Sequence, residues 1–306
     1  MLATSSTTIG PHADAVVALL DDKGDYIFDI KMDGIRCQAL VDHGVVTLVS
    51  RSGQNITRKY PDVVQHLEGI YPGETRTFDG EIVVWNGERF DFSLAQRRDA
   101  QSHPAKINQI AKQYPATYVA FDLLRLEEED LRELPLMLRL KLLATEGERF
   151  TDGLLVSQYA EDGRAMWEAV QLFGFEGMIA KHRHSRYVGR RQSTWIKVKR
   201  LHRVTCIVTG WDPGQGNRQG LVGALHLCLL SEAGVLVPVG KVGTGLKAAD
   251  HGPLLEVLRS GSEFLVEVEY LDFDSGQLRQ PVYRGVRSDV GRSDCGLSQV
   301  VVPATQ

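Results

Sequence analysis

Residues 28–36 read FDIKMDGIR and place Lys31 at the end of a short β-forming stretch, in the pattern Lys-x-Asp-Gly-x-Arg. A lysine amine can attack phosphorus and form a phosphoramidate, which divides one difficult group transfer into two easier ones. Attack requires the neutral amine, and both desolvation and nearby cations lower the pKa of a lysine. Arg36 and the Lys197/Lys199 pair would supply such cations. Taken alone, the tetrad fits an exposed hairpin charge at least as well.

Two glutamates occupy similar settings further along the chain. Glu81 in FDGEIVVW is predicted on a strand behind an Asp-Gly turn, and Glu176 in FEGMIAK has a comparable place. Carboxylates suit a hard cation such as Mg²⁺, which takes oxygen ligands and keeps several waters. A strand-edge acid without a metal is the alternative for each glutamate.

In WIKVK, two lysines alternate with apolar residues, so Lys197 and Lys199 are predicted to project from one face of a strand. Two cations on one face can hold a phosphate. A solvated strand face is the equally simple alternative.

Composition indicates a globular protein of one large or two ordinary domains. The chain has 306 residues, of which 43% are hydrophobic and 24% charged. No apolar run is long enough to cross a bilayer, and the N-terminal residues lack a secretory pattern, so we expect a cytoplasmic protein without a membrane partner. Cys37, Cys206, Cys228 and Cys295 are scattered without a CxxC pair, which disfavours a zinc module or a disulfide framework.

The net charge of −4 is unevenly distributed along the sequence. Residues 177–203 contain no Asp or Glu, whereas their basic residues are Lys181, Arg183, Arg186, Arg190, Arg191, Lys197, Lys199, Arg200 and Arg203. Such a segment is a candidate polyanion-binding strip, although charged runs commonly form solvated faces.

Hydrophobic periodicity predicts an α+β fold. Strands are expected within 26–50 and over 116–126, 176–182 and 193–200, a hairpin over 77–90 with its turn at Asn86-Gly87, and helices over 58–70, 93–113, 134–148 and 163–175. Beyond residue 200, short β-rich segments surround one helical stretch at 253–261. We therefore predict residues 1–200 as a domain of antiparallel sheets flanked by helices, and residues 201–306 as an OB-fold barrel.

Taken together and in order, KMDGIR, SRSGQNITRKYP, FDGEIVVW, YVAFDLL, EGMIAK and WIKVKR resemble the motifs of ATP-dependent DNA ligases, within the covalent nucleotidyltransferase superfamily. Past residue 200, GNRQGLVGALHL, VGKVGTGL and LRQPVYRGVRSD are similar to the ligase module of bacterial end-joining proteins. The resemblance covers residues from about 10 to 290.

This resemblance implies that Lys31 takes AMP from ATP, with Mg²⁺ (or Mn²⁺) held by Glu81 and Glu176. Asp29, beside Ile30, would read adenine, Phe121 would stack on it, and Arg36 and Arg51 would hold the ribose, the phosphates or the nick. Lys181, Lys197 and Lys199 would hold phosphate. Arg287 and Asp289, in a segment with Arg279 and Arg284, would orient pyrophosphate in the first step.

The implied reaction seals nicked duplex DNA in three phosphoryl transfers, by a monomer that a DNA end-binding protein could recruit. An RNA ligase or a capping guanylyltransferase of the same superfamily is one alternative. A DNA-binding module that kept the fold and lost the chemistry is the other.

Overall fold

The computed structural model describes residues 2–5 and 13–300, which divide into two compact units, each with its own hydrophobic core. The first unit contains residues 2–5 and 13–198, and the second contains residues 199–300. Each unit is described separately below.

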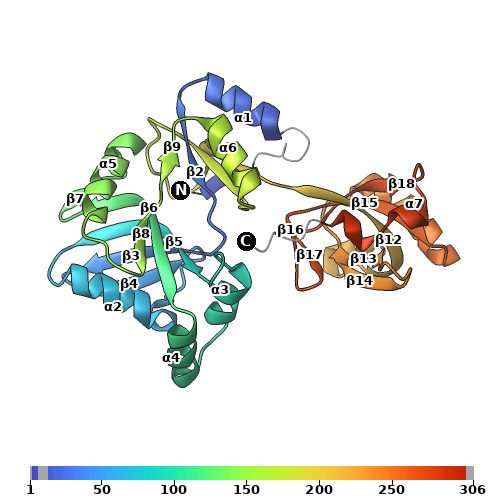
Figure 1. Ribbon diagram of the computed structural model, residues 1–306, viewed down its shortest axis with the longest axis horizontal. Coiled ribbons are helices and arrows are strands. Elements are labelled where there is room, and N and C mark those ends of the chain that lie inside the picture. The colour runs from blue at the N-terminus through green and yellow to red at the C-terminus, as the bar shows by residue number, and fades with distance from the viewer. Residues whose placement is uncertain (1, 6–12, 301–306) are drawn as a thin grey trace. The chain divides into compact units, whose positions relative to one another are not determined.

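The first unit contains two sheets (Figure 1). The first sheet has the order β1 (Leu2–Ser5), β11 (Arg191–Lys199), β10 (Gly177–His182), β2 (Tyr26–Ile30) and β9 (Tyr159–Ala160). The second has the order β4 (Val45–Ser50), β3 (Ile35–Asp42), β5 (Arg76–Val84), β6 (Ala116–Leu126) and β7 (Glu129–Asp130), with β8 (Leu154–Val156) parallel to β6. The remaining pairs of the second sheet are antiparallel, as are β2–β10 and β2–β9.

Helices cover these sheets with their apolar faces, because only one stripe of each helix is hydrophobic. The α-helices are α1 (Ala13–Asp22), α2 (Pro61–Ile70), α3 (Phe92–Asp99), α4 (Pro104–Gln113), α5 (Leu136–Gly147) and α6 (Gly163–Leu172), and a 3₁₀ turn η1 (Thr57–Lys59) precedes α2. Helix α6 packs on β10 and β2, α1 packs on α6, and α5 packs on β6. In Figure 1, α3 and α4 lie at the lower end of this unit.

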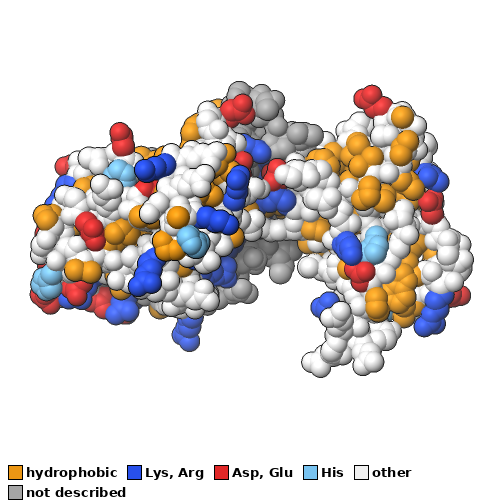
Figure 2. Space-filling model, turned by 90° about the horizontal axis from the view of Figure 1, so that it is seen from below, with side chains coloured by type: hydrophobic (Ala, Val, Ile, Leu, Met, Phe, Trp, Pro, Cys, Tyr) orange, Lys and Arg blue, Asp and Glu red, His pale blue; other side chains and the backbone are white. Residues whose placement is uncertain are grey.

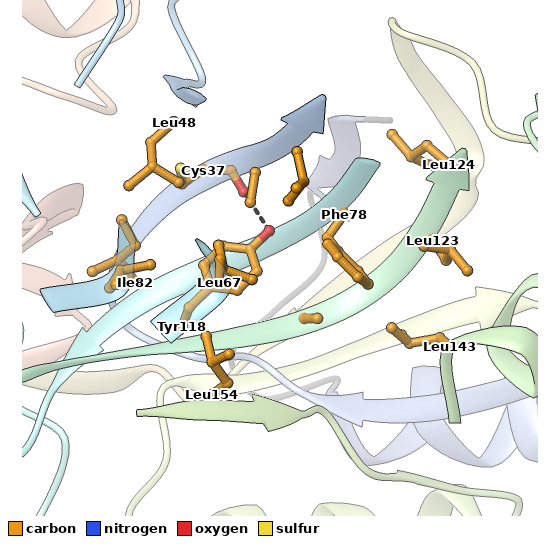
Figure 3. Packing of buried hydrophobic residues seen from close by; sticks show 14 of the residues in the cluster. Cys37, Leu48, Leu67, Phe78, Ile82, Tyr118, Leu123, Leu124, Leu143 and Leu154 are labelled. Carbon is orange, nitrogen blue, oxygen red and sulfur yellow. Dashed lines mark hydrogen bonds between the residues drawn. The ribbon is translucent and has the colours of Figure 1, made fainter. Parts of the chain in front are cut away.

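The core of the first unit lies between the second sheet and its helices (Figure 3). Phe78, Ile82 and Tyr118 are fully buried there. The hydroxyl of Tyr118 donates to the carbonyl oxygen of Cys37 at 3.1 Å, so the polar end of this buried ring is satisfied. This core fixes β3, β5 and β6, the strands that carry Arg36, Glu81 and Phe121.

The second unit is built on one antiparallel sheet of order β14-β13-β12-β15-β18. Its elements are β12 (His202–Pro213), η2 (Gly216–Arg218), β13 (Val222–Leu230), β14 (Leu236–Val242), α7 (Ala248–Ser260), β15 (Phe264–Tyr270), the pair β16 (Asp272–Asp274) and β17 (Gln277–Arg279), β18 (Val282–Arg287), η3 (Arg292–Asp294) and η4 (Leu297–Gln299). Helix α7 begins earlier than predicted, where the Asp250 carboxylate accepts from the backbone N–H of Lys247 at 2.6 Å.

Two predicted elements differ in the structure. The predicted turn at Asn86-Gly87 is present: the backbone N–H of Asn86 donates to the carbonyl oxygen of Arg89 at 3.0 Å, and an antiparallel bridge joins Trp85 to Phe90. The predicted hairpin has no second strand, however, and β5 takes its strand partners from β3 and β6. The predicted helix over 93–113 is two helices, because Pro104 lacks an N–H and starts a new helix.

The four cysteines are free and buried. No helix within residues 2–5 and 13–300 has the length and apolarity needed to cross a membrane.

Candidate active site

Lys31 follows β2 and lies opposite β10, whose pairing with β2 brings together residues 145 positions apart. Its backbone N–H donates to the carbonyl oxygen of Gly177 at 2.9 Å, and its amine forms an ion pair with Glu176. The side chain of Lys31 is 17% exposed and that of Glu176 only 4%. Lys31 is therefore not an exposed hairpin charge, and an acid contacts its amine directly.

Arg36 lies on β3 opposite Glu81 of β5. Its guanidinium chelates Asp79, with Nε 3.2 Å from Oδ1 and Nη2 2.6 Å from Oδ2. The hydroxyl of Tyr187 donates to the same Oδ2 at 2.8 Å and accepts from the side-chain amide of Gln38 at 2.9 Å. Asp79 is fully buried, so this network fixes the orientation of the Arg36 guanidinium.

Burial raises the pKa of Glu81 to about 8, against the opposing effect of the nearby cations Lys31 and Arg36. The carboxylates of Asp79 and Glu176 raise this pKa further. Each of these groups is close enough to shift the ionisation of Glu81. We call Lys31, Arg36, Glu81 and Glu176 the Lys31 cluster.

Asp29 and Lys181 form a buried ion pair beside the cluster, with Lys181 Nζ 2.5 Å from Asp29 Oδ2. The hydroxyl of Ser157 donates to the other carboxylate oxygen of Asp29. The ammonium of Lys181 also lies 4.9 Å from the ring centroid of Phe121 and 4.7 Å from that of Trp195. Its charge is balanced by a carboxylate and by two aromatic rings.

Phe121 is the residue at which side chains from both sheets meet. It comes from β6 of the second sheet, and its ring centroid lies 6.2 Å from that of Trp195 on β11 of the first sheet. The guanidinium of Arg36 lies 5.5 Å from the same ring centroid. The side chains predicted to act on a nucleotide therefore converge between the two sheets of the first unit.

The glycines of both Asp-Gly pairs are required by close packing, not by turns. A Cβ on Gly34 would lie 2.3 Å from the carbonyl oxygen of Ile82 and 2.9 Å from the side chain of Glu81. A Cβ on Gly80 would lie 2.6 Å from the ring of Tyr118. The predicted Asp79-Gly80 turn is wrong, since both residues lie within β5, where the pairing with β6 shifts register.

Three further predicted residues of the first unit lie around this region. Ile30 ends β2 in register with Met178. Lys197 lies on β11, two residues from Trp195 and hence on the same strand face. Arg51 follows β4, is exposed, and lines a cleft of about 860 Å³ together with Arg36 and others; Lys31 is not among the lining residues.

The other predicted residues lie in the second unit. Lys199 Nζ donates to the side-chain oxygen of Gln280 at 2.8 Å. The guanidinium of Arg287 makes two hydrogen bonds of 2.7 Å to Asp289 and one of 3.0 Å to Glu267. On the same strand as Arg287, Arg284 pairs with Glu269, and on β17 the Nη1 of Arg279 lies 3.9 Å from Asp272.

The strip at residues 177–203 is free of acid in the sequence only. Four of its cations pair with acids from distant segments, in the pairs Lys181–Asp29, Arg183–Glu161, Arg186–Glu133 and Arg203–Glu267. These four cations are therefore balanced by acids that the sequence of the segment does not contain.

Sequence reasoning missed Asp79, Ser157, Tyr187 and Trp195 as parts of this site. Asp79 lies in FDGEIVVW, the motif chosen for Glu81, and Trp195 lies in WIKVKR, the motif chosen for its lysines, so both motifs already contained the missed residue. Ser157 and Tyr187 lie in segments whose spacing gives no sign that they hydrogen-bond a buried carboxylate.

The two sheets and the helices packed on them form a mixed α/β fold, which matches the nucleotidyltransferase-like fold of a solved DNA ligase domain. Residues 1–199 match the family described as "ATP dependent DNA ligase domain". The chain belongs to this family.

A multifunctional non-homologous end joining protein, LigD, of Pseudomonas aeruginosa is 33% identical over 87% of this chain and 34% of its own length. The solved ligase domain of M. tuberculosis LigD is 28% identical, covers 96% of each chain and has a TM-score of 0.55. Mycobacterial DNA ligase D complexed with ATP and MES is 29% identical over 96% of this chain and 97% of its own, also with a TM-score of 0.55. The chain spans 49% or less of the length of the LigD proteins that it matches in Bacillus subtilis, M. tuberculosis and P. aeruginosa.

Proposed function

We propose that this protein is an ATP-dependent DNA ligase that seals a nick between a 5′-phosphate and a 3′-hydroxyl, with Lys31 as the nucleophile. The observation that carries the proposal is the half-buried amine of Lys31, held by Glu176 beside Arg36 and Glu81, in a chain of the DNA ligase family. ATP as the nucleotide is supported by the similar mycobacterial ligase, which is complexed with ATP.

The proposed reaction has three steps. The Nζ of Lys31 forms a bond to the α-phosphorus of ATP. The bond between the α-phosphorus and the oxygen that bridges to the β-phosphorus breaks, and pyrophosphate leaves. The Glu176 carboxylate, which contacts Nζ, is placed to take the amine's proton. The 5′-phosphate of DNA then attacks the lysine-bound AMP and releases the amine, and the 3′-hydroxyl attacks the adenylated phosphate and expels AMP. Each transfer depends mainly on in-line positioning and charge neutralisation.

The roles proposed for the other residues follow their positions. Arg36, held by Asp79, is suited to the ribose and phosphates, and exposed Arg51 to the nick. Phe121 offers a ring for adenine between the sheets, and Asp29 with the main chain of Ile30 is suited to reading the base edge. In the described structure, Asp29 already bonds Lys181 and Ser157, so base reading would use its remaining lone pairs.

Lys181, Lys197 and Lys199 are proposed to hold phosphate, and Arg287 with Asp289 to orient pyrophosphate in the first step. The latter pair is preformed by two hydrogen bonds, which fixes the guanidinium plane.

The residues of the Lys31 cluster fit Mg²⁺. Within residues 2–5 and 13–300, no three His, Cys, Asp or Glu side chains are arranged so that they could hold a metal ion by themselves. Mg²⁺ is commonly held by one or two carboxylates together with substrate phosphates and water. Glu81 and Glu176 would supply those carboxylates, and the bound ion would neutralise charge on the phosphates.

We further propose residues 1–200 as the adenylyltransferase domain and residues 201–306 as an OB-fold domain. The five-stranded antiparallel sheet with one helix supports the latter. A cytoplasmic monomer that acts on nicked duplex DNA, recruited by a DNA end-binding protein, remains part of the proposal.

The test is incubation with α-labelled ATP and Mg²⁺. We expect label that stays on the protein in SDS and that Lys31→Arg abolishes, while Lys141→Arg, an exposed lysine on α5, keeps it. An unlabelled wild-type protein would contradict the proposal and favour a non-catalytic DNA-binding module.

Labelling from GTP instead of ATP would indicate a capping guanylyltransferase. Sealing one nick with DNA or RNA on its 3′ side, in parallel reactions, separates a DNA ligase from an RNA ligase.

A further inference from the structure

Three exposed cations at one end of the first unit come from different elements. Arg58 belongs to η1, Arg97 to α3 and Lys112 to α4, and all three are exposed. Within the described part of the chain, none of the three forms an ion pair. We call them the α3–α4 basic surface. Figure 2, which views the molecule from below, shows Lys and Arg side chains spread over the end of the first unit where α3 and α4 lie.

One buried arginine brings these elements together. Arg98 is fully buried, and its guanidinium holds both carboxylate oxygens of Asp62, at 2.7 and 2.9 Å. It also donates to the carbonyl oxygen of Tyr114 at 2.8 Å and, more weakly, to that of Lys59 at 3.5 Å. It therefore joins α3 to α2, to the end of α4 and to η1. The members of the surface are one or two residues from Lys59, Arg98 and Tyr114, so the backbone that carries each of them lies close to this arginine.

The acids near the surface are already engaged. Asp62 is held by Arg98, and Asp99 lies 3.4 Å from the amine of Lys59 and accepts from the Tyr60 hydroxyl at 3.3 Å. In the sequence, residues 43–61 and 100–121 contain no Asp or Glu. Neither of these two acids neutralises the three exposed cations.

Packing also restrains one of the cations. The guanidinium of Arg97 lies 5.9 Å from the ring centroid of Tyr114, a cation–π distance that limits the freedom of its side chain. A restrained arginine loses less conformational entropy when it binds an anion.

We propose that the α3–α4 basic surface binds the phosphate backbone of duplex DNA away from the reacting phosphate; this inference rests on the proposed function. The cations nearest the reaction are engaged by Glu176, Asp79 and Asp29, so they position groups and add little net charge. A ligase that acts on any sequence needs affinity from phosphate contacts, which carry no sequence information. Unpaired arginine and lysine side chains on one surface provide such contacts.

The test compares two triple variants of the full chain with equal loss of charge. The first is Arg58→Gln/Arg97→Gln/Lys112→Gln. The matched control is Lys23→Gln/Lys141→Gln/Arg164→Gln, three exposed cations elsewhere on the same unit. The measurement is binding of a nicked duplex over a series of salt concentrations, with self-adenylation by labelled ATP as the second readout.

We expect the first variant to bind the duplex about tenfold or more weakly at 100 mM salt. Its slope of log K against log salt should be shallower by about 2.7, since each lost phosphate contact removes about 0.9. Self-adenylation uses no DNA and should keep its wild-type rate.

An unchanged slope, or an equal change in the control variant, would overturn the inference, because the effect would then not belong to this surface. That result leaves self-adenylation intact, whereas failure of the proposed function appears as a wild-type protein that takes no label. The two failures are therefore distinguishable.

Discussion

Positive charge is organised differently in two regions of the first unit. In and beside the Lys31 cluster, each of three cations contacts an acid, in the pairs Lys31–Glu176, Arg36–Asp79 and Lys181–Asp29. On the α3–α4 basic surface, Arg58, Arg97 and Lys112 are exposed and form no ion pair within the described residues. An ion pair fixes the orientation of a cation but weakens the electrostatic field around it. An unpaired exposed cation has a freer side chain and a stronger field in solvent.

We therefore expect the paired cations to position reacting groups and the unpaired cations to provide affinity for DNA. Substitutions near Lys31 should change chemistry more than DNA affinity, and substitutions on the basic surface should do the reverse. The basic surface also depends on one buried ion pair, because Arg98 holds its elements together.

The largest effect is expected from Arg98→Met. This change removes the charged partner of the Asp62 carboxylate, which keeps only the backbone N–H of Ala116 at 2.8 Å. Removing one member of a buried ion pair destabilises a protein by roughly 3–5 kcal/mol. Urea unfolding measures it. The adjacent Arg97→Met removes an exposed cation and should stay within about 0.5 kcal/mol of wild type. Equal stability of the two variants would show that Arg98 does not hold this end of the unit.

If Arg98→Met does not fold, Arg98→Lys retains the charge and loses the paired geometry. Arg98→Lys should fold, and its urea midpoint should be lower than that of the wild type.

A pH-dependent effect is expected from Glu81→Gln, measured in EDTA so that no metal binds. The folded-state pKa of Glu81 is raised from 4.5 to about 8, so the folded protein holds this proton more tightly than the unfolded chain. Its contribution to stability is therefore complete below about pH 4.5 and is lost as pH rises towards 8, at up to about 1.4 kcal/mol per pH unit.

Glutamine resembles the protonated acid and does not titrate. Relative to Glu81→Gln, the wild type should thus become less stable as pH rises from 5 to 8, as urea midpoints would show. The exposed Glu88→Gln is the control and should give parallel curves. Parallel curves for Glu81→Gln as well would contradict the raised pKa.

The smallest effect is expected from Tyr187→Phe, which removes the hydroxyl that donates to Asp79 and keeps the ring. One hydrogen bond contributes about 0.5–1.5 kcal/mol, so the KM for ATP in self-adenylation should rise by about 2- to 10-fold through a looser Arg36. The change in kcat should be smaller. Tyr159→Phe, at a 40% exposed tyrosine, is the control. An unchanged KM would show that Tyr187 does not act through Arg36.

Much of the first unit could be predicted from local patterns. The strand Ala116–Leu126 was predicted with the bounds that the structure gives, because alternation and β-branched residues are local signals. Of the hairpin at 77–90, the turn was predicted correctly and the second strand was not, because β3 and β6, which are not adjacent to β5 in the sequence, pair with its two edges.

The sequence by itself determined which residues could perform the chemistry: Lys31, Arg36, Glu81 and Glu176 stand in motifs whose order resembles that of DNA ligases. Tertiary structure alone decided which charge meets which. Glu176 reaches Lys31 across 145 residues, and Asp29 neutralises Lys181 across 152. Hydrophobic periodicity is read within one element, but Coulombic partners are chosen by distance in space after the sheets have formed. For that reason four of the nine cations at 177–203 pair with acids from distant segments, whereas Arg58, Arg97 and Lys112 are exposed on elements that Arg98 joins.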